Sequence, residues 1–541
     1  MPSYDHLSKE ELVRLLQARD RRDATRFGLV WEANEIERDA AINADFVALD
    51  LVPELCSGSG PWRNLIIEGD NFDALRHLRM TYAGEVKCVY IDPPYNTGNK
   101  DFVYNDRFVD KNDSWRHSTW VEFMYQRLTL AKDLLRSDGV IFVSIDDNEM
   151  PALSLLMKRI FGEGNFVANC IWQKRYSSAA DHKTIAPMHE YVLVYQMSPL
   201  WQRNLLPRTE KKDRQYRLHD EGGNFRPDNY TCNKSAEERR NLYYPIIQPN
   251  TGEEIWPKKT AVWRYSRERH LENVANDLIY WGKDGKGKVP AFKRYKHLLR
   301  TGDGVVPNTW WTFNEVGHSD EAKKELMTVL PEEARAFSTP KPVRLIERVL
   351  QIGCGKDDLV VDFFAGSGTT AHAVLKLNAQ DGGNRRFILV SSTEATEMEP
   401  DKNLCRDVCA KRVRRVIEGY GGNEGTGGDF AYLRCRRISP GRLLEIEHEQ
   451  VWSALQMTHF ETLAPYQEAP FLTAGNEAQL VIYVPRYDAA SLPALKKAVK
   501  PCLSAIIYSW QPESLRQKVR FTHVQHAAIP ESLALRFGLR D

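Results

Sequence analysis

The sequence lacks a large net charge of either sign and any long apolar run. Its 541 residues carry 74 Lys plus Arg against 73 Asp plus Glu, so the whole-chain charge predicts no particular partner. No apolar run approaches the roughly 18 residues that a membrane span needs, and residues 1–23 contain no apolar stretch typical of a signal peptide. We therefore expect a cytoplasmic protein that does not associate with membranes.

The sequence also lacks a regular cysteine pattern. Its nine cysteines are scattered and include no C-x-x-C pair, which argues against a disulfide framework and a zinc site, so no bound metal is expected. Cys405 and Cys409 are spaced as on one face of a helix, and we interpret them as two buried thiols. An aromatic content of 10% and a charged content of 27% are ordinary for a globular protein and argue against a disordered chain.

The length predicts two to four domains of about 100 to 200 residues each. Residues 1–60 are expected to form an N-terminal helical segment, because a capping-box pattern at Ser8 and Glu11 precedes leucines at helical spacing. Such a helix would serve packing or dimerisation. Residues 419–428 contain six Gly in ten positions and are interpreted as a flexible boundary before a C-terminal domain at 429–541.

Strand and helix patterns alternate in residues 61–199 and again in residues 336–418. Apolar runs such as VKCVYI and GVIFVSI, separated by amphipathic helices, predict an α/β fold with a parallel sheet covered on both faces. Each segment is too short for a complete doubly wound domain, so we expect a single sheet interrupted by an insertion at 200–335. A strand-helix-strand unit near residues 479–510 predicts a small α/β domain at the C-terminus.

The insertion carries an uneven share of the charge. Residues 201–300 hold 22 Lys plus Arg against 13 Asp plus Glu, an excess of +9 that leaves about −8 for the rest, and they hold 13 aromatic residues. Basic residues neutralise phosphates and aromatic rings pack against bases, which favours nucleic acid binding. A solvated basic face over an aromatic core has the same composition, so both interpretations stay open. The candidate DNA contacts are Lys258, Lys259, Arg264, Arg267, Lys293 and Arg294.

The first candidate catalytic loop is Asp92-Pro93-Pro94-Tyr95, which follows the apolar strand at residues 86–91. A carboxylate at the carboxyl end of a parallel strand lies where α/β sheets bind ligands. Two prolines remove two N–H donors, so the turn presents carbonyl acceptors. A carboxylate beside the Pro93 carbonyl suits an exocyclic amine with two N–H donors, and Tyr95 offers a ring for base stacking. A purely structural turn is the alternative.

The second loop, at residues 362–370, joins a strand to a helix and reads DFFAGSGTT. Gly366 and Gly368 allow close backbone approach, and the helix N-terminus that follows attracts anionic groups. The loop lacks the third Gly of a dinucleotide fingerprint, which disfavours a nicotinamide cofactor. GCGKD at 353–357 does not match a P-loop, so no nucleotide-hydrolysis motif is evident.

Together, IDPPYNTGN and DFFAGSGTT resemble the catalytic and S-adenosylmethionine (SAM) motifs of the DNA amino-methyltransferases, in the order of their permuted β class. Further segments, among them LIIEGDNFDAL, WVEFMYQRLTLAKDLL, GVIFVSIDDNE and FSTPKPVRLIERVL, are similar to the modification (Mod) subunits of type III restriction-modification systems. The resemblance covers most of residues 25–200 and 335–435. It implies a Rossmann-like mixed sheet interrupted by a target-recognition insertion, a small α/β C-terminal domain, and SAM as the cofactor.

The resemblance also implies roles for individual residues. The catalytic set, which would hold a flipped base, is Asp92, Pro93, Pro94 and Tyr95. The cofactor set is Asp362, Phe364, Ala365, Gly366, Ser367, Gly368, Thr369 and Thr370 of the glycine loop, with Thr339 and Lys341 for the methionine carboxylate, Asp70 for the adenine amine and Glu394 for the ribose. For Asp70 and Lys341 the alternative is a surface charge or a helix cap. Asp146 and Asp147 invite a metal or acid/base interpretation, but loop capping or packing near the target-base pocket is favoured.

The activity implied by the resemblance is methyl transfer from SAM to N6 of adenine in double-stranded DNA, because Asp occupies the first position of the catalytic motif. Methylation of N4 of cytosine is the alternative. A homodimer and a separate helicase-nuclease restriction subunit are the implied partners, and the C-terminal domain would serve dimerisation or docking. An orphan methylase, a specificity and assembly subunit, and an RNA or protein methyltransferase are the rival interpretations.

Overall fold

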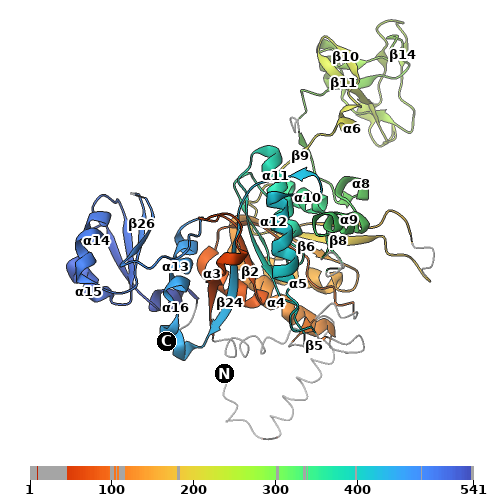
Figure 1. The fold of residues 1–541 in the computed structure, drawn as a ribbon. Coiled ribbons are helices and arrows are strands. Elements are labelled where there is room, and N and C mark those ends of the chain that lie inside the picture. The colour runs from red at the N-terminus through yellow and green to blue at the C-terminus, as the bar shows by residue number, and fades with distance from the viewer. Residues whose placement is uncertain are drawn as a thin grey trace.

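The computed structural model describes residues 45–97, 116–178, 183–299, 304–332, 339–396, 399–476 and 478–537, together with Lys9, Val103–Tyr104, Arg107–Phe108 and Phe337. The helix expected from the capping-box pattern at Ser8 and Glu11 therefore lies outside the described residues, apart from Lys9. A ten-stranded sheet forms the centre of the molecule (Figure 1). Its strands, from edge to edge, are β1 (Phe46–Leu51), β24 (Ala431–Ile438), β2 (Leu65–Glu68), β21 (Arg386–Ser391), β20 (Leu359–Asp362), β3 (Val86–Ile91), β6 (Leu135–Ile145), β8 (His189–Gln196), β7 (Phe166–Gln173) and β19 (Trp310–Trp311).

The sheet is mixed, as the family resemblance implied. The six strands from β24 to β6 run parallel to one another, whereas β1 pairs antiparallel with β24, and β8 pairs antiparallel with both β6 and β7. The fully parallel sheet expected from periodicity alone is wrong at these edges, because a buried apolar strand has the same pattern in either direction. Strands from both halves of the sequence alternate in the sheet, which confirms a single interrupted α/β unit.

Helices cover both faces of the sheet. On one face lie α8 (Phe313–Val316), α9 (Ser319–Val329), α10 (Val343–Gly353), α11 (Thr369–Asp381) and α12 (Lys411–Glu418). On the other lie α3 (Asn71–Tyr82), α4 (Arg116–Leu134) and α5 (Met150–Phe161). The apolar residues of each strand therefore point alternately into two cores. For example, Val140 and Phe142 of β6 pack into the first core, and Ile141 and Val143 pack into the second.

Three expected boundaries differ from the structure. Residues 46–51, placed in the helical segment 1–60, form strand β1. The glycine-rich stretch 419–428 contains a small hairpin of β22 (Gly419–Tyr420) and β23 (Asn423–Glu424), and the chain then enters the central sheet as β24. It is thus not a boundary between domains. The insertion 200–335 is also too long, because β19 pairs with β7 and Leu326 of α9 lies in the main core.

The separate lobe therefore spans about residues 206–305, and it stands apart from the body in Figure 1. A two-stranded neck of β9 (Leu206–Pro207) and β18 (Gly304–Val305) connects it to the sheet. Its other elements are α6 (Glu210–Asp213), β10 (Leu218–Asp220), β11 (Gly223–Asn229), β12 (Thr231–Cys232), β13 (Ile246–Ile247), β14 (Glu254–Ile255), β15 (Val262–Trp263), α7 (Arg267–Ala275), β16 (Ile279–Tyr280) and β17 (Ala291–Tyr295). Tyr230, Tyr244 and Trp263 form much of its core.

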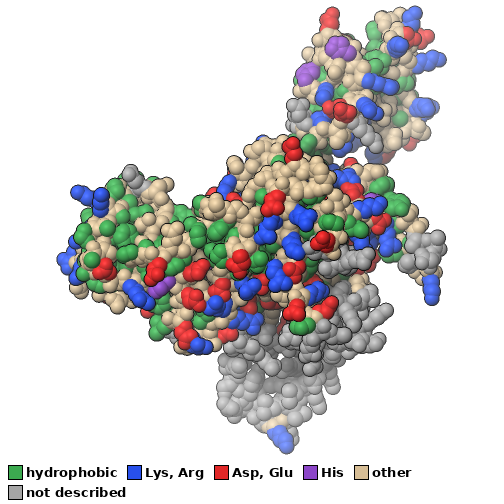
Figure 2. Space-filling view, viewed as in Figure 1, with side chains coloured by type: hydrophobic (Ala, Val, Ile, Leu, Met, Phe, Trp, Pro, Cys, Tyr) green, Lys and Arg blue, Asp and Glu red, His purple; other side chains and the backbone are tan. Residues whose placement is uncertain are grey.

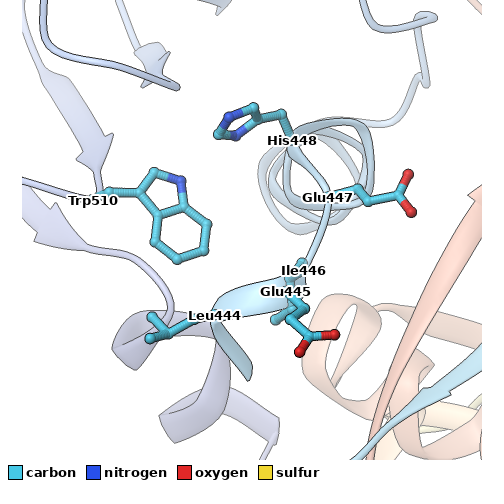
Figure 3. Close-up of a pocket in the computed structure, with 6 residues that line it drawn as sticks. All are labelled: Leu444, Glu445, Ile446, Glu447, His448 and Trp510. Carbon is cyan, nitrogen blue, oxygen red and sulfur yellow. The ribbon is translucent and has the colours of Figure 1, made fainter. Parts of the chain in front are cut away.

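A C-terminal α/β unit follows α13 (His448–His459), which packs on β1 and α3. Its elements are β25 (Leu472–Gly475), β26 (Leu480–Val484), α14 (Leu492–Val499), β27 (Ala505–Ser509), α15 (Pro512–Lys518), β28 (Val524–Ala528) and α16 (Glu531–Phe537). The succession β26-α14-β27 confirms the expected strand-helix-strand unit. A surface hollow of about 450 Å³ is lined by residues 444–448 and by Trp510. Figure 3 shows the rings of His448 and Trp510 near each other, with a centroid distance of 6.2 Å. Within the part of the chain that the structure describes, no helix is long and apolar enough to cross a membrane.

Candidate active site

The two loops singled out in the sequence open at the same edge of the sheet. β20 and β3 are adjacent and parallel, with Val360 opposite Cys88 and Val361 opposite Val89. Asp362 ends β20, and Asp92 follows the end of β3. Because the carboxyl ends of neighbouring parallel strands form the ligand-binding edge of an α/β sheet, the glycine loop and the Asp92 loop face one site.

The Asp92 loop is held from behind by α4. The indole N–H of Trp120, which is fully buried, donates to the Pro94 carbonyl at 2.7 Å. Asn96 adopts a φ of +56° and its side-chain amide donates to Glu149 at 2.6 Å. These bonds fix the turn at two points, so the carboxylate of Asp92 is presented by a rigid backbone.

Lys341 contacts this carboxylate directly. From the segment before α10, its ammonium donates to both oxygens of Asp92 at 2.7 Å and to the Tyr95 hydroxyl at 2.8 Å. The Tyr95 hydroxyl is also within hydrogen-bond distance of two carboxylates, 2.8 Å from Asp92 and 3.0 Å from Glu190. Burial raises the pKa of Asp92, and the charge of Lys341 opposes that rise.

Glu190 is a second buried carboxylate at this site. It is the second residue of β8 and accepts a hydrogen bond from Lys174 at 3.0 Å. Its Oε2 atom lies 3.4 Å from the Lys341 ammonium. Burial alone would raise the pKa of Glu190, but the positive charges of Lys341 and Lys174 lower it below its ordinary value. The four charged groups alternate in sign, which reduces the free-energy penalty of burying them together.

The glycine loop requires two residues without side chains. Gly366 and Gly368 have φ values of +49° and +76°, and a Cβ on Gly366 would lie only 2.8 Å from the ring of Phe337. Asp362 accepts from the Phe364 amide at 3.0 Å and from the Thr370 hydroxyl at 2.5 Å. Burial raises the pKa of Asp362 to about 7, despite these hydrogen bonds.

Arg412 supports the same loop from the interior. This fully buried guanidinium on α12 donates to the hydroxyls of Ser367 at 3.0 Å and Thr369 at 2.8 Å. The preceding π-helical turn, Cys405–Ala410, places the Cys409 sulfur 3.1 Å from the position of a Cβ on Gly368. Cys405 and Cys409 are both buried thiols, as expected. π-Helical turns frequently occur at functional sites, and this one packs against the loop.

The remaining cofactor candidates follow the ends of neighbouring strands. Asp70, after β2, caps α3 by accepting from the Phe72 amide at 2.8 Å, and it pairs with Arg127 at 3.2 Å, with 48% of its side chain exposed. Glu394, after β21, is exposed with a φ of +53° and lies 3.1 Å from Lys402. The strand order β2-β21-β20 arranges Asp70, Glu394 and the glycine loop along one edge. Phe364 is partly buried against Phe123, Ala365 is buried, and Thr339 is exposed.

The candidate DNA contacts in the lobe divide into three groups. Lys258, Lys259 and Arg267 are exposed, and Figure 2 shows several Lys and Arg side chains on the visible face of the lobe. Arg264 and Arg294 are about 40% exposed and share the carboxylate of Asp228, at 3.5 and 2.8 Å.

The expectation for Lys293 is wrong. Its ammonium is buried between Asp220 at 2.8 Å and Asp277 at 2.7 Å, so its charge is already neutralised and inaccessible to a phosphate. The aromatic residues of the lobe also divide, because Trp263 is buried in the lobe core whereas Trp256 is 48% exposed. The aromatic-core interpretation therefore holds for Trp263, whereas Trp256 and the exposed basic residues remain accessible at the surface.

Asp146 caps its own loop, and Asp147 contacts β8. Asp146 accepts from the backbone amide and the side-chain amide of Asn148 at 2.9 and 2.8 Å, and Asp147 accepts from the Tyr191 hydroxyl at 2.8 Å. Among the described residues, no group of three or more His, Cys, Asp or Glu side chains is arranged to hold a metal ion.

Sequence reasoning does not identify Glu190, Lys174 or Arg412. Glu190 reaches the site because β8 runs antiparallel to β6, which brings the start of β8 to the edge where β3 ends. The run HEYVLVYQ carries no signal of strand direction. The basic run KRVRRV likewise has the composition of a surface helix, although Arg412 is buried together with its two valines.

Comparison with known proteins identifies the family. Residues 86–394, which include both loops and the lobe, match the N6_N4_Mtase family model, described as DNA methylase. The chain belongs to this family of DNA methylases. Members of the family take their methyl group from SAM. The site fits that cofactor for two reasons. Gly366 and Gly368 have no side chains, so the backbone of the loop can lie close to a bound cofactor. The carboxylates of Asp70 and Glu394 are acceptors suited to the adenine amine and the ribose hydroxyls of SAM.

Three relatives are similar to this member of the family over much of its length. It is 35% identical over 408 residues to the type III restriction-modification enzyme StyLTI Mod subunit of Salmonella typhimurium, covering 70% of this chain and 60% of that protein. It is 33% identical to the EcoPI Mod subunit of Escherichia phage P1, covering 66% and 62%. It is 32% identical to the type II methyltransferase M.KpnI of Klebsiella pneumoniae, covering 60% and 79%. The chain thus spans less than two thirds of the length of the two Mod subunits.

Proposed function

We propose that this chain is a site-specific DNA methyltransferase that transfers the methyl group of SAM to N6 of adenine in double-stranded DNA, as the modification component of a type III restriction-modification system. The observation that carries the proposal is the pairing of two loops at one sheet edge. The Asp92 carboxylate, suited to an amine, lies beside a glycine loop suited to the cofactor. The similarity to two Mod subunits supports the type III assignment.

Individual residues of the site have distinct roles in the proposed reaction. Bound SAM supplies an electrophilic methyl group attached to a sulfonium. Asp92 and the Pro93 carbonyl accept the two N–H donors of the target amine, which favours a tetrahedral nitrogen whose lone pair can attack. Trp120 keeps the Pro94 turn in place during this step. Positioning and the charge of Asp92 therefore supply most of the catalysis, with no covalent enzyme intermediate.

The target base must leave the duplex before it reaches this edge. An enzyme that acts on a stacked base flips it out, at a free-energy cost of a few kcal/mol. Tyr95 provides a ring beside Asp92 against which the flipped base can stack. Adenine is proposed over cytosine because Asp occupies the first position of the motif, a preference that comes from the resemblance to the amino-methyltransferases.

The lobe at residues 206–305 is proposed to recognise the DNA sequence. Its exposed Lys258, Lys259 and Arg267 would neutralise phosphates, and the exposed ring of Trp256 is available for contact with sugar or base. Arg264 and Arg294 would contribute only after exchanging Asp228 for a phosphate. The lobe's attachment through a two-stranded neck suits an element that contacts DNA while the sheet carries the chemistry.

The proposed assembly is a homodimer that acts in the cytoplasm with a separate helicase-nuclease restriction subunit. The C-terminal unit, with its surface hollow beside Trp510, is the candidate region for these contacts. A second candidate function is that of a stand-alone methylase, which the similarity to a type II methyltransferase over 79% of its length favours. Co-purification with a helicase-sized protein supports the first, and a solitary active enzyme supports the second.

Methyl-labelled SAM tests the proposed activity. The purified chain is incubated with it and with duplex DNA, RNA or protein, and the DNA is then digested to nucleosides. We expect label in N6-methyladenine. Label in N4-methylcytosine would contradict the adenine assignment, and label confined to RNA or protein would contradict the substrate class.

A further inference from the structure

The catalytic edge holds more charge than the proposed chemistry requires. Lys174, Glu190, Lys341 and Asp92 form one continuous chain of ion pairs, with nitrogen-oxygen distances of 3.0, 3.4 and 2.7 Å. The Tyr95 hydroxyl contacts both carboxylates and the Lys341 ammonium. Of these four charged groups, the proposed reaction uses only the Asp92 carboxylate, so Lys341 and Glu190 require a separate explanation.

Lys341 occupies the position on Asp92 that a substrate amine would take. An ammonium has three N–H donors, and those of Lys341 are directed at the two oxygens of Asp92 and at the Tyr95 hydroxyl. With the side chain 9% exposed, this contact leaves little room for a second donor. A target amine can therefore use the Asp92 carboxylate fully only after Lys341 has moved away from it.

Glu190 makes that movement inexpensive. Separating a buried ammonium from its only counter-ion leaves an uncompensated charge, which costs several kcal/mol. Lys341 already lies 3.4 Å from Glu190, so a small side-chain rotation exchanges one carboxylate for the other. Lys174 is the second partner of Glu190 and keeps that carboxylate in place.

We propose that Lys341 is a positioning residue that holds the Asp92 carboxylate until the target amine replaces it, and that Glu190 is the counter-ion that receives Lys341. This inference rests on the proposed function, because it assumes an amine as the group that enters. It assigns Lys341 to the catalytic carboxylate, in contrast to the cofactor role implied by the family resemblance.

The environment of Asp92 determines what each substitution does. The charged or titratable groups that face Asp92 and its immediate partners are Tyr90, Tyr95, Asp146, Lys174, Glu190, Lys341 and Asp362. Of these, Lys341 is the cation that directly contacts the carboxylate. Its removal leaves burial and neighbouring negative charge to raise the pKa of Asp92, so the ionised form is reached only at higher pH.

The first experiment measures kcat/KM for adenine methylation against pH in Lys341→Met and Lys341→Arg. We expect the acidic limb of the Lys341→Met profile to move upward by about 1 to 3 pH units, as for loss of an opposite charge within 4 Å, and Lys341→Arg to restore it. Lys87→Met is the matched control, because Lys87 also forms a 2.8 Å pair with an aspartate but lies at the opposite end of β3. If the acidic limb of the pH profile does not move in Lys341→Met and SAM affinity is lost, Lys341 is a cofactor-binding residue, and that result would overturn the proposal.

The second experiment tests Glu190. In Glu190→Gln, Lys341 has no alternative carboxylate, so we expect kcat/KM to fall about tenfold or more, equivalent to 1.4 kcal/mol or more. The double variant Glu190→Gln/Lys341→Met should be more active than Glu190→Gln alone at a pH where Asp92 is ionised, because the competitor is gone. A purely structural role for Glu190 predicts the reverse, with the double variant less active than either single one, and that result would overturn the assignment.

A substrate-free measurement separates this proposal from the proposed function. The infrared carboxyl band that disappears in Asp92→Asn is titrated in the wild type and in Lys341→Met, without DNA. We expect its midpoint to rise in Lys341→Met, whatever the methyl acceptor is. An unchanged midpoint overturns the positioning role, whereas an enzyme that shows the shift but does not methylate adenine contradicts only the proposed function.

Discussion

The hydrogen bond between Trp120 and the Pro94 carbonyl provides a quantitative test of how the catalytic loop is held. Trp120→Phe removes the indole N–H that donates at 2.7 Å, while an apolar ring still fills most of the buried site. A carbonyl left without its partner costs about 1 to 3 kcal/mol, and the partial exposure of Pro94 places this one in the lower half of that range. If the lost hydrogen bond raises the activation free energy by the same amount, about 1 to 2 kcal/mol, kcat falls about 5- to 30-fold.

The matched control is Trp263→Phe in the lobe. Trp263 is also fully buried and also donates to a backbone carbonyl, that of Tyr244, at 2.7 Å. Both variants should lose similar stability in denaturant titrations, but only Trp120→Phe should lose kcat at saturating SAM and DNA. Unchanged SAM affinity in Trp120→Phe, measured by calorimetry, would locate the effect in the Asp92 loop. A wild-type kcat in Trp120→Phe, or an equal loss in Trp263→Phe, would refute this reasoning.

Two further predictions concern charge. Replacing Lys258, Lys259 and Arg267 by Ala should weaken DNA binding and reduce its salt dependence without changing SAM affinity. Lys293→Ala should mainly destabilise the lobe. DNA affinity measured as a function of salt concentration detects the first effect, and chemical denaturation detects the second. Because the pKa of Asp362 is about 7 in the folded protein and 3.8 ordinarily, the folded state keeps a proton that the unfolded chain loses, so the free energy of unfolding should fall as pH rises from about 4 to 7. Asp362→Asn should remove that part of the pH dependence in urea titrations, and an identical slope in both proteins would contradict the assignment.

The parts of the fold that depend on local pattern could be predicted from the sequence. The strands that precede Asp92 and Asp362 are apolar runs followed by turn residues, and both turns lie where expected. The strand-helix-strand unit of the C-terminal domain follows from the same kind of pattern. The positions of β1, β19 and β24 could not be predicted, because they depend on pairing between segments that are well over 100 residues apart.

The candidate site shows the same division. Motif spacing identifies Asp92, Tyr95 and the glycine loop, since each belongs to one short segment. Glu190 and Lys341 meet Asp92 only because three separate segments converge at one sheet edge. Composition also cannot distinguish Lys293 from Lys258, although one is buried between two aspartates and the other is exposed. Long-range packing, which local pattern does not encode, decides the role of each.

Modified-base sequencing of DNA from cells that express this chain, or its Asp92→Ala variant, tests the central claim most directly. The wild type should place N6-methyladenine at one recurring sequence, and the variant should place none while retaining SAM affinity and stability. Methylation by Asp92→Ala at the wild-type level, or no methylated adenine with the folded wild type, would contradict methyl transfer to adenine at the Asp92 site.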